Sequence, residues 1–376
     1  MAWRGVNSSD LTGVDAGTDT PASAPGRQRR GRWPLRLLSV VFGLFLFVLA
    51  LDLLKDGAHA YGRAIVEFLN VGSPASALGF GWLLAYLFLS GSPVAAIAIT
   101  FFASGTLDAL QTFTMITGSR LGASLIVLVV GFLYYLRGYR RAASIAIGVL
   151  ALLTTAAIYL PALALGYWVL SSGVVGTINA EADVPLTSFL DWLYAPILAL
   201  IDGLGLPGWA LFAAGIFVLL GAFALLDRAL PQIEPGTGEF SRIGRLVYRP
   251  MVMFALGMAV TSVTLSVSVS LSILVPLSAR GLVRRENTLP YIMGANITTF
   301  IDTLVAALIV GGAAAFTIVL VEMVSVAILS LIVILLVYRR FQRLVLRTQD
   351  AIVRDRRTLV AFLAIMLIVP VVLLML

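Results

Sequence analysis

The sequence contains apolar runs that are long enough to cross a membrane. A helix rises about 1.5 Å per residue, so roughly 20 apolar residues are needed to span a hydrocarbon core of about 30 Å. Charged residues make up only 12% of the 376 residues, whereas a soluble domain carries about 25%. We therefore expect an all-α polytopic membrane protein. Five segments are long enough to span: Leu35 to Leu54, Ala143 to Leu170, Trp209 to Leu226, Ala314 to Val337 and Thr358 to Leu376.

The residue types also exclude several kinds of chemistry. The chain has no cysteine and one histidine, His59, which rules out thiolate, disulfide and multi-histidine metal sites. It offers no nucleophile motif and no phosphate-cradling loop, so we expect neither an enzyme nor a cofactor, and no metal other than sodium. The formal net charge is +7, but the arginines cluster at the ends of apolar segments, as topology signals do. A nucleic-acid partner is therefore not expected.

One apolar stretch, Ala75 to Gly105, is interrupted at its centre by the sequence SGSP at Ser90 to Pro93. Glycine and proline end a helix there. The arm from Ser92 to Ser104 is short, and a helix of that length extends roughly 20 Å, past the middle of the membrane but not across it. The pattern predicts a re-entrant hairpin whose tip lies near the membrane midplane.

The arginines indicate which segment ends face the cytoplasm, because short cytoplasmic loops carry the excess of Lys and Arg. Arginines precede the first span, fill the loop at Arg137 to Arg141 and recur through Arg339 to Arg357, whereas the loop after Leu170 is acidic. We therefore expect a cytoplasmic N-terminus in the plasma or inner membrane of the cell. The first hairpin is then entered from outside and a second one, near Thr261 to Ala279, from inside, which implies an inverted repeat.

Glycine spacing supports two related halves. The polar tips SGS and SVS directly follow Leu89 and Leu265. Two glycines then recur at the same distances along the sequence from each leucine, namely Gly105 and Gly118 in the first half, and Gly281 and Gly294 in the second. Such self-similarity is typical of an internal repeat.

The expected organisation has six parts. They are a disordered cytoplasmic tail (1–33), transmembrane repeat 1 (34–171), an extracellular loop (172–207), the inverted transmembrane repeat 2 (208–338), a basic cytoplasmic loop held against anionic lipid (339–357) and a C-terminal transmembrane helix (358–376).

The stretch from Tyr291 to Leu308 reads YIMGANITTFIDTLVAAL and places polar residues within an apolar run. Unwound backbone is tolerated in a membrane only inside protein or around a cavity. We therefore predict that the helix breaks at Gly294 to Thr298 and that the freed amides face a binding site. Secondary transporters often have broken helices of this kind at mid-membrane.

These motifs resemble those of the type II sodium/phosphate cotransporters. That family begins each repeat with an FLFG-like helix, has Gln-Ser-Ser-Ser at each hairpin tip and Gly-Ala/Ser-Asn-Ile-Gly-Thr at each helix break. Here GLFLF, the tips LSGS and LSVS, and the sequences GSRLGAS and GANITTF occupy these positions, within about Leu35 to Val337. The resemblance implies two inverted repeats, each with a re-entrant hairpin and a broken transmembrane helix. It also implies Na+-coupled uptake of inorganic phosphate or a similar small anion by alternating access.

The sequence departs from the family at the polar positions. Leu89 and Leu265 stand where the family has glutamine, and Gly91 and Val267 replace serines. Arg120 stands where the first asparagine belongs. Two alternatives to the cotransporter therefore stay open: a sodium-independent anion carrier or channel, and a non-transporting membrane scaffold with the same fold.

The candidate site residues lie at the two tips and the two helix breaks. Helix N-termini just after the tips suit an anion; the alternative for each serine is a bond to its own helix. The expected substrate-binding residues are Ser90, Gly91, Ser92, Ser119, Arg120, Ser266, Ser268 and Asn296. The expected ion-binding residues are Ser124, Thr298, Thr299 and Asp302.

Arg120 and Glu322 are charged residues within apolar sequence, where a charge is costly and is normally paired or functional. Three interpretations of Arg120 compete: a guanidinium fork for an anionic substrate, a fixed charge in place of a sodium ion, and a structural partner of Asp302. Glu322 could carry a proton, but pairing with a neighbouring segment is the favoured interpretation.

Overall fold

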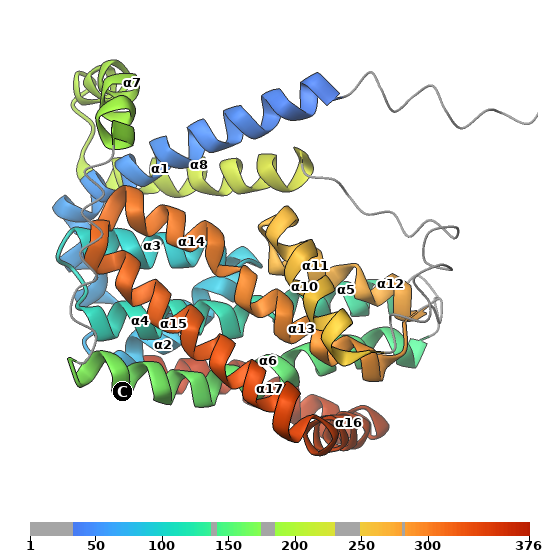
Figure 1. The fold of residues 1–376 in the computed structure, drawn as a ribbon. Helices are drawn as coiled ribbons and strands as arrows, with labels where there is room; N and C mark the ends of the chain where they lie inside the picture. The colour runs from blue at the N-terminus through green and yellow to red at the C-terminus, as the bar shows by residue number, and fades with distance from the viewer. Residues whose placement is uncertain (1–32, 137–140, 174–184, 230–248, 280–282) are drawn as a thin grey trace, which may run out of the picture.

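The computed structural model describes residues 33–136, 141–173, 185–229, 249–279 and 283–376, and its regular elements there are all helical (Figure 1). In chain order they are α1 (Trp33–Phe68), α2 (Pro74–Phe88), α3 (Ser92–Ala103), α4 (Ala109–Ala123), α5 (Leu125–Leu136), α6 (Arg141–Ser171), α7 (Pro185–Asp202), α8 (Gly208–Ala229), α10 (Pro250–Thr264), α11 (Val267–Ser272), α12 (Leu274–Ala279), α13 (Arg285–Thr298), α14 (Phe300–Ala306), η2 (Ala307–Gly311), α15 (Gly312–Ile332), η3 (Val333–Val337), α16 (Tyr338–Arg354) and α17 (Arg356–Leu374). The segments η2 and η3 are single π-helical turns.

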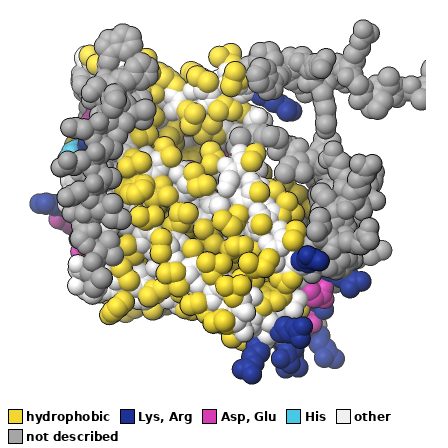
Figure 2. Space-filling model, viewed as in Figure 1, with side chains coloured by type: hydrophobic (Ala, Val, Ile, Leu, Met, Phe, Trp, Pro, Cys, Tyr) yellow, Lys and Arg dark blue, Asp and Glu magenta, His cyan; other side chains and the backbone are white. Residues whose placement is uncertain are grey.

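The chain is a multi-pass membrane protein. Within the described ranges, six helical stretches are long and apolar enough to cross a membrane: Arg36–Phe68, Ala109–Leu133, Ile145–Ser171, Gly208–Ala229, Arg285–Arg354 and Arg356–Leu374. Figure 2 shows hydrophobic side chains across the middle of one face, with charged side chains at its margins. The all-α class expected from the sequence is confirmed. The stretch Ala109–Leu133, formed by α4 and α5, is long and apolar enough to span in addition to the five segments predicted from the sequence.

The helices α1 and α8 lie side by side along most of their length (Figure 1). Glycines allow their backbones to approach closely: a Cβ atom on Gly57 would lie 2.5 Å from the backbone nitrogen of Phe212. Only a residue without a side chain fits such a contact.

Two further contacts between α1 and α8 are reciprocal. A Cβ atom on Gly43 would meet the side chain of Leu226 at 2.9 Å, and one on Gly215 would meet the side chain of Leu54 at 2.8 Å. The step along the sequence from Gly43 to Gly215 equals the step from Leu54 to Leu226. Each helix therefore presents the same two positions to the other, as in a two-fold symmetric interface.

Two helical hairpins have matching turns. The first joins α2, of 15 residues, to α3, of 12 residues. The second joins α10, of 15 residues, to α11 and α12, of 6 residues each. All these helices are shorter than the roughly 20 residues needed for a span. Leu89 and Leu265 end α2 and α10 in the left-handed conformation, with φ of 51° and 49°. Leucine adopts this conformation at a cost of about 1–2 kcal/mol.

Each hairpin packs against one further helix through equivalent glycines. Gly118 of α4 faces α2, where a Cβ atom would lie 2.1 Å from the carbonyl oxygen of Leu78. Gly294 of α13 faces α10, where a Cβ atom would lie 2.1 Å from the carbonyl oxygen of Phe254. Gly294 follows Gly118, and Phe254 follows Leu78, by the same number of residues that separates Leu265 from Leu89. We call this step the repeat offset.

The prediction of a helix break at Gly294 to Thr298 is wrong. Helix α13 continues through Thr298 because Gly294 serves the close contact with α10 instead of a turn. The irregularity is confined to Thr299, and its N–H still donates to the carbonyl of Ala295 at 3.1 Å. Ser124 likewise separates α4 from α5, and its N–H donates to the carbonyl of Gly122. Neither site has a stretch of unwound backbone with unpaired amides.

Two segments expected as loops contain helices. Helix α7 lies within the expected loop 172–207, and the basic segment 339–357 is mostly α16. On α16 the side chains of Val345, Gln349 and Ile352 are buried while the arginines are exposed. The expected tail up to residue 32 and most of the arginine-rich loop at 137–141 lie outside the described residues.

Candidate functional site

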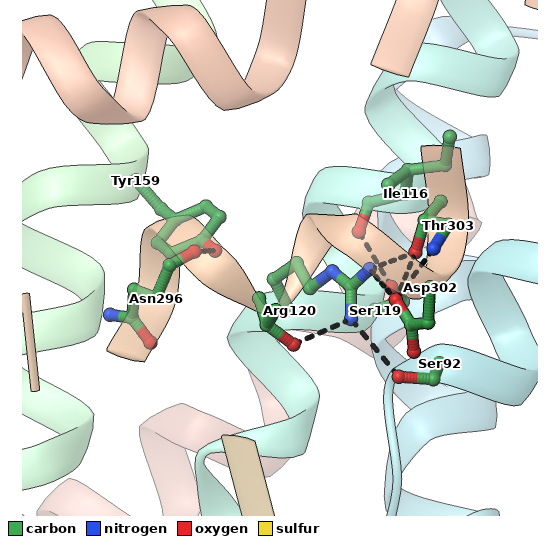
Figure 3. Close-up of polar contacts among 9 residues, drawn as sticks. Ser92, Ile116, Ser119, Arg120, Tyr159, Asn296, Asp302 and Thr303 are labelled. Atoms are coloured by element: carbon green, nitrogen blue, oxygen red, sulfur yellow. Dashed lines mark hydrogen bonds and ion pairs between the residues drawn. The ribbon is translucent and has the colours of Figure 1, made fainter. Parts of the chain in front are cut away.

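The side chain of Arg120 is buried in the interior of the helical bundle, with a residue exposure of 3%. Its guanidinium donates to hydroxyl groups of Thr299, at 3.3 Å, of Ser92, at a long 3.5 Å, and of Thr303. The Asp302 carboxylate lies 3.8 Å from the same group (Figure 3). One arginine therefore gathers polar groups from α3, α14 and the junction between α13 and α14.

Thr303 links the two charges. Its hydroxyl accepts a hydrogen bond from Arg120 and donates one of 2.9 Å to Asp302 Oδ1, and its backbone N–H donates to the same oxygen at 2.6 Å. Oδ2 of Asp302 and Nε of Arg120 have no hydrogen-bond partner. A buried ion pair of this kind becomes costly when one member is removed, because the other charge is left in a medium of low dielectric constant.

An aromatic ring completes the surroundings of the guanidinium. The Phe300 ring centroid lies 4.8 Å from the guanidinium carbon of Arg120, a cation–π contact. The ring is fully buried and lies 6.3 Å from the ring of Tyr159 on α6. The guanidinium of Arg120 is thus closely packed against the Phe300 ring of α14.

Asn296 follows Arg120 by the repeat offset, so it occupies the equivalent position of the second half. Its amide nitrogen donates to the hydroxyl of Thr155 at 3.1 Å, and its backbone carbonyl accepts from Tyr159 at 3.0 Å. Both partners belong to α6. The threonines of LLTTAAIY, polar residues within that apolar span, are the sequence feature that indicates this contact.

Several predicted site hydroxyls bond to backbone instead of facing a site. Ser119 donates to the carbonyl of Ile116 at 2.7 Å, and Ser124 to that of Leu121 at 2.6 Å. Thr298 donates to the carbonyl of Met258 at 3.1 Å. The alternative of a bond to the own helix therefore holds for both serines, and Thr298 instead ties α13 to α10.

The two hairpin tips differ in what they contact. Gly91 lies against α4, where a Cβ atom would be 2.9 Å from the carbonyl oxygen of Ser119, and Ser90 beside it is half-buried. Ser266 caps α11 by accepting from the N–H of Val269 at 3.3 Å. The side chain of Ser268 lies outside the described residues. The first tip therefore reaches the Arg120 cluster through Ser92, while Ser266 is engaged with its own helix.

Glu322 lies in the middle of α15 and is 1% exposed. Neither carboxyl oxygen has a hydrogen-bond partner, and no ion pair reaches it from the described residues. The pairing favoured by the sequence is not found.

Two cavities border these elements. A small one of about 80 Å³ lies between the second tip and α1, α8 and α14, and Asp227, Thr264, Leu265 and Asp302 are among its lining residues. A larger one of about 850 Å³ lies between α6, α12, α13 and α16, and is lined by polar residues that include Ser278, Arg284, Arg285, Glu286, Gln349, Asp350 and Arg354. Among the described residues no three His, Asp or Glu side chains gather as a metal site would require.

The fold and site define a polytopic helical membrane protein with a buried ion pair. Comparisons with models of known families, with characterised proteins and with solved structures gave no match. The resemblance to the sodium/phosphate cotransporters therefore rests on the sequence motifs alone.

Proposed function

We propose that this protein is a secondary transporter that moves a small anion, with inorganic phosphate as the first candidate, by alternating access. The observation that carries the proposal is the buried Arg120 cluster. It joins α4 and the start of α3 from the first half to Thr299, Asp302 and Thr303 from the second half. An arginine at this depth is rarely without function.

The repeated contacts support two inverted repeats. Equivalent glycine contacts recur at the repeat offset, and α1 and α8 exchange the same two contacts across an antiparallel interface. A two-fold axis across antiparallel spans lies in the membrane plane, as in inverted-repeat transporters. The short hairpins α2–α3 and α10–α12 lie toward opposite ends of the bundle (Figure 1). They would then be re-entrant from opposite sides, with the arginine-rich end and the N-terminus in the cytoplasm of a plasma or inner membrane.

The position of Arg120 bears on the coupling ion. Its guanidinium stands between Thr299 and Asp302, two of the residues predicted to bind sodium. Hydroxyl and carboxylate oxygens are ligands that hard cations prefer. This favours the interpretation in which Arg120 replaces a sodium ion, so the transporter would work without sodium. Sodium coupling, which the family resemblance implies, is the competing expectation.

The test is uptake of radiolabelled phosphate into proteoliposomes under inward gradients of sodium, potassium or protons. Arg120→Lys keeps the charge but cannot reproduce the guanidinium fork, and we expect it to lower uptake at least about 10-fold. Arg343→Ala removes an exposed arginine of α16 and serves as the matched control. Sodium-stimulated uptake that other gradients do not reproduce would favour the sodium-coupled alternative.

One observation favours a second candidate, a non-transporting scaffold. Arg120 is almost fully buried and held by Asp302 and three hydroxyls, as a structural ion pair would be. If the wild-type protein takes up neither phosphate nor other small anions such as sulfate under any gradient, the scaffold is the better account.

A further inference from the structure

Glu322 differs from the other buried charged groups because it has no bonded partner. Arg120 and Asp302 face each other through Thr303, whereas both Glu322 oxygens lack a hydrogen bond and an ion pair among the described residues. A buried carboxylate without a partner is costly in a medium of low dielectric constant. Carboxyl groups in this situation are typical of ion and proton pathways in membrane proteins.

The surroundings of Glu322 come from α4 and α6. At Gly166 of α6, a Cβ atom would touch both the Phe113 ring of α4 and the Ser325 hydroxyl of α15. Thr117 lies one turn further along α4 and Glu322 one turn earlier along α15, so the two side chains are neighbours. The Thr117 hydroxyl, however, donates to the carbonyl of Phe113 at 3.0 Å.

The ionisable groups that face Glu322 are few. From α4 it is Arg120, and from α6 it is Tyr159, whose hydroxyl donates to the carbonyl of Asn296. From α14, the carboxylate of Asp302 lies 3.8 Å from the Arg120 guanidinium. The adjoining α3 and η2 carry no ionisable side chain, and those of α13 (Arg285, Glu286 and Tyr291) lie in its first two turns, before Asn296.

We propose that Glu322 is the proton-binding group of this protein and that one proton moves together with the anion. The proton comes from water on one side of the membrane, binds a carboxylate oxygen of Glu322 and leaves to water on the other side. Only this O–H bond forms and breaks. The cotransport part rests on the proposed function, whereas proton binding by Glu322 does not depend on it.

Electrostatics supplies the coupling. Asp302 lies 3.8 Å from the Arg120 guanidinium, and the charge of the buried Glu322 acts on the same arginine. A proton on Glu322 removes one negative charge that acts on Arg120, so an anion is attracted more strongly to the arginine. By thermodynamic linkage a bound anion then strengthens proton binding by the same factor. Alternating access would carry the two together.

The first measurement is infrared difference spectroscopy of the whole reconstituted protein during a pH change, without substrate. We expect a carboxylic-acid C=O band that titrates in the wild-type protein and is absent in Glu322→Gln. Glu322→Asp should keep a titrating band at a shifted frequency, which decides the assignment if the glutamine variant does not fold. Glu286→Gln, a partly exposed carboxyl of α13, should leave the band unchanged.

The second measurement is uptake of radiolabelled phosphate in sodium-free buffer with acid outside. We expect Glu322→Gln to lower proton-driven uptake about 10-fold while phosphate exchange at equal pH persists. A band that is absent from the wild-type protein, or that survives in Glu322→Gln, overturns the assignment whatever the transport result. If the band titrates as expected but no variant takes up any anion, proton binding by Glu322 stands and the transport proposal fails. Equal proton-driven uptake by wild type and Glu322→Gln would overturn the coupling.

Discussion

Arg120 and Asn296 occupy equivalent positions in the two halves, yet their surroundings differ in charge. Arg120 binds across the two halves, to Ser92 of the first and to Thr299, Asp302 and Thr303 of the second. The Asn296 side chain makes one neutral hydrogen bond, to Thr155 of α6. The two positions have similar glycine contacts nearby but different partners: Arg120, the charged centre, holds a buried charge, whereas Asn296, the neutral centre, joins α13 to α6.

The difference between Arg120 and Asn296 shows which positions of this fold can carry different residue types. The glycine contacts that hold α2 to α4 and α10 to α13 are the same in both halves, to 2.1 Å. The residue two positions after each of these glycines is free to be charged or neutral, provided that its neighbours supply suitable partners. Asp302 and Thr303 supply them for Arg120.

The largest expected effect is the loss of the ion pair in the charged centre. Arg120→Leu leaves Asp302 buried without its cation, and removing one member of a buried pair costs about 3–5 kcal/mol. Asp302→Leu should cost a similar amount, whereas the double variant should regain a large part of the loss. Chemical unfolding in detergent micelles measures this, with Arg343→Ala as control. A double variant as unstable as the sum of the single variants would show that the two residues do not act as a pair.

The next effect tests the shared scaffold. Gly118→Ala and Gly294→Ala each bring a methyl group against a carbonyl oxygen of the partner helix, and overpacking of this kind costs about 1–3 kcal/mol. Because the two contacts are equivalent, we expect the same loss of unfolding free energy from both. Gly221→Ala on α8 is the control, since a Cβ atom there meets nothing within 4 Å. Clearly unequal losses at Gly118 and Gly294 would break the equivalence of the halves.

The neutral centre should be weaker than the charged one. Asn296→Ala removes the hydrogen bond to Thr155, and side-chain bonds between membrane helices contribute about 0.6 kcal/mol on average, up to about 1.7 kcal/mol. We therefore expect Asn296→Ala to lower the free energy of unfolding by about 1 kcal/mol, measured in the same unfolding assay. Thr155→Val should cost about as much, and adding it to Asn296→Ala should cost little more. A loss as large as that of Arg120→Leu would contradict the contrast between the two centres.

The smallest effect concerns the tips. Glycine adopts the left-handed conformation of Leu89 and Leu265 without strain, which relieves about 1–2 kcal/mol, but it loses about 0.5–1 kcal/mol through its greater freedom in the unfolded chain. We therefore expect Leu89→Gly and Leu265→Gly each to stabilise the protein by about 0–1.5 kcal/mol. Thermal unfolding in detergent would detect a small rise in Tm, and a fall at one tip only would show that the tips are not equivalent.

The sequence predicted the parts of the fold that depend on apolar run length and on strong helix-ending residues. The long spans and the arm after Pro93 lie where hydrophobicity and proline place them. The break expected at Gly294 failed because a glycine inside a helix has two uses, a turn or a close contact. Only the position of the neighbouring helix decides between them.

The candidate site was predicted in part. The pairing of Arg120 with Asp302 was one of three interpretations, and the structure brings these residues together. Thr303, Phe300 and Tyr159 were missed, because their contribution depends on which side of a buried helix faces the arginine. In a span that is apolar on all sides, hydrophobic periodicity does not give that direction.

The close contact of Gly57 with the backbone of Phe212 has a consequence for biosynthesis. The two residues lie far apart in the sequence, and at about 5–20 residues per second a ribosome needs roughly 8–30 s to make the chain between them. During that interval α1 has no α8 to pack against, so its glycine-lined face meets lipid or an insertion factor. Slower elongation between the two helices would prolong the exposure of this face of α1.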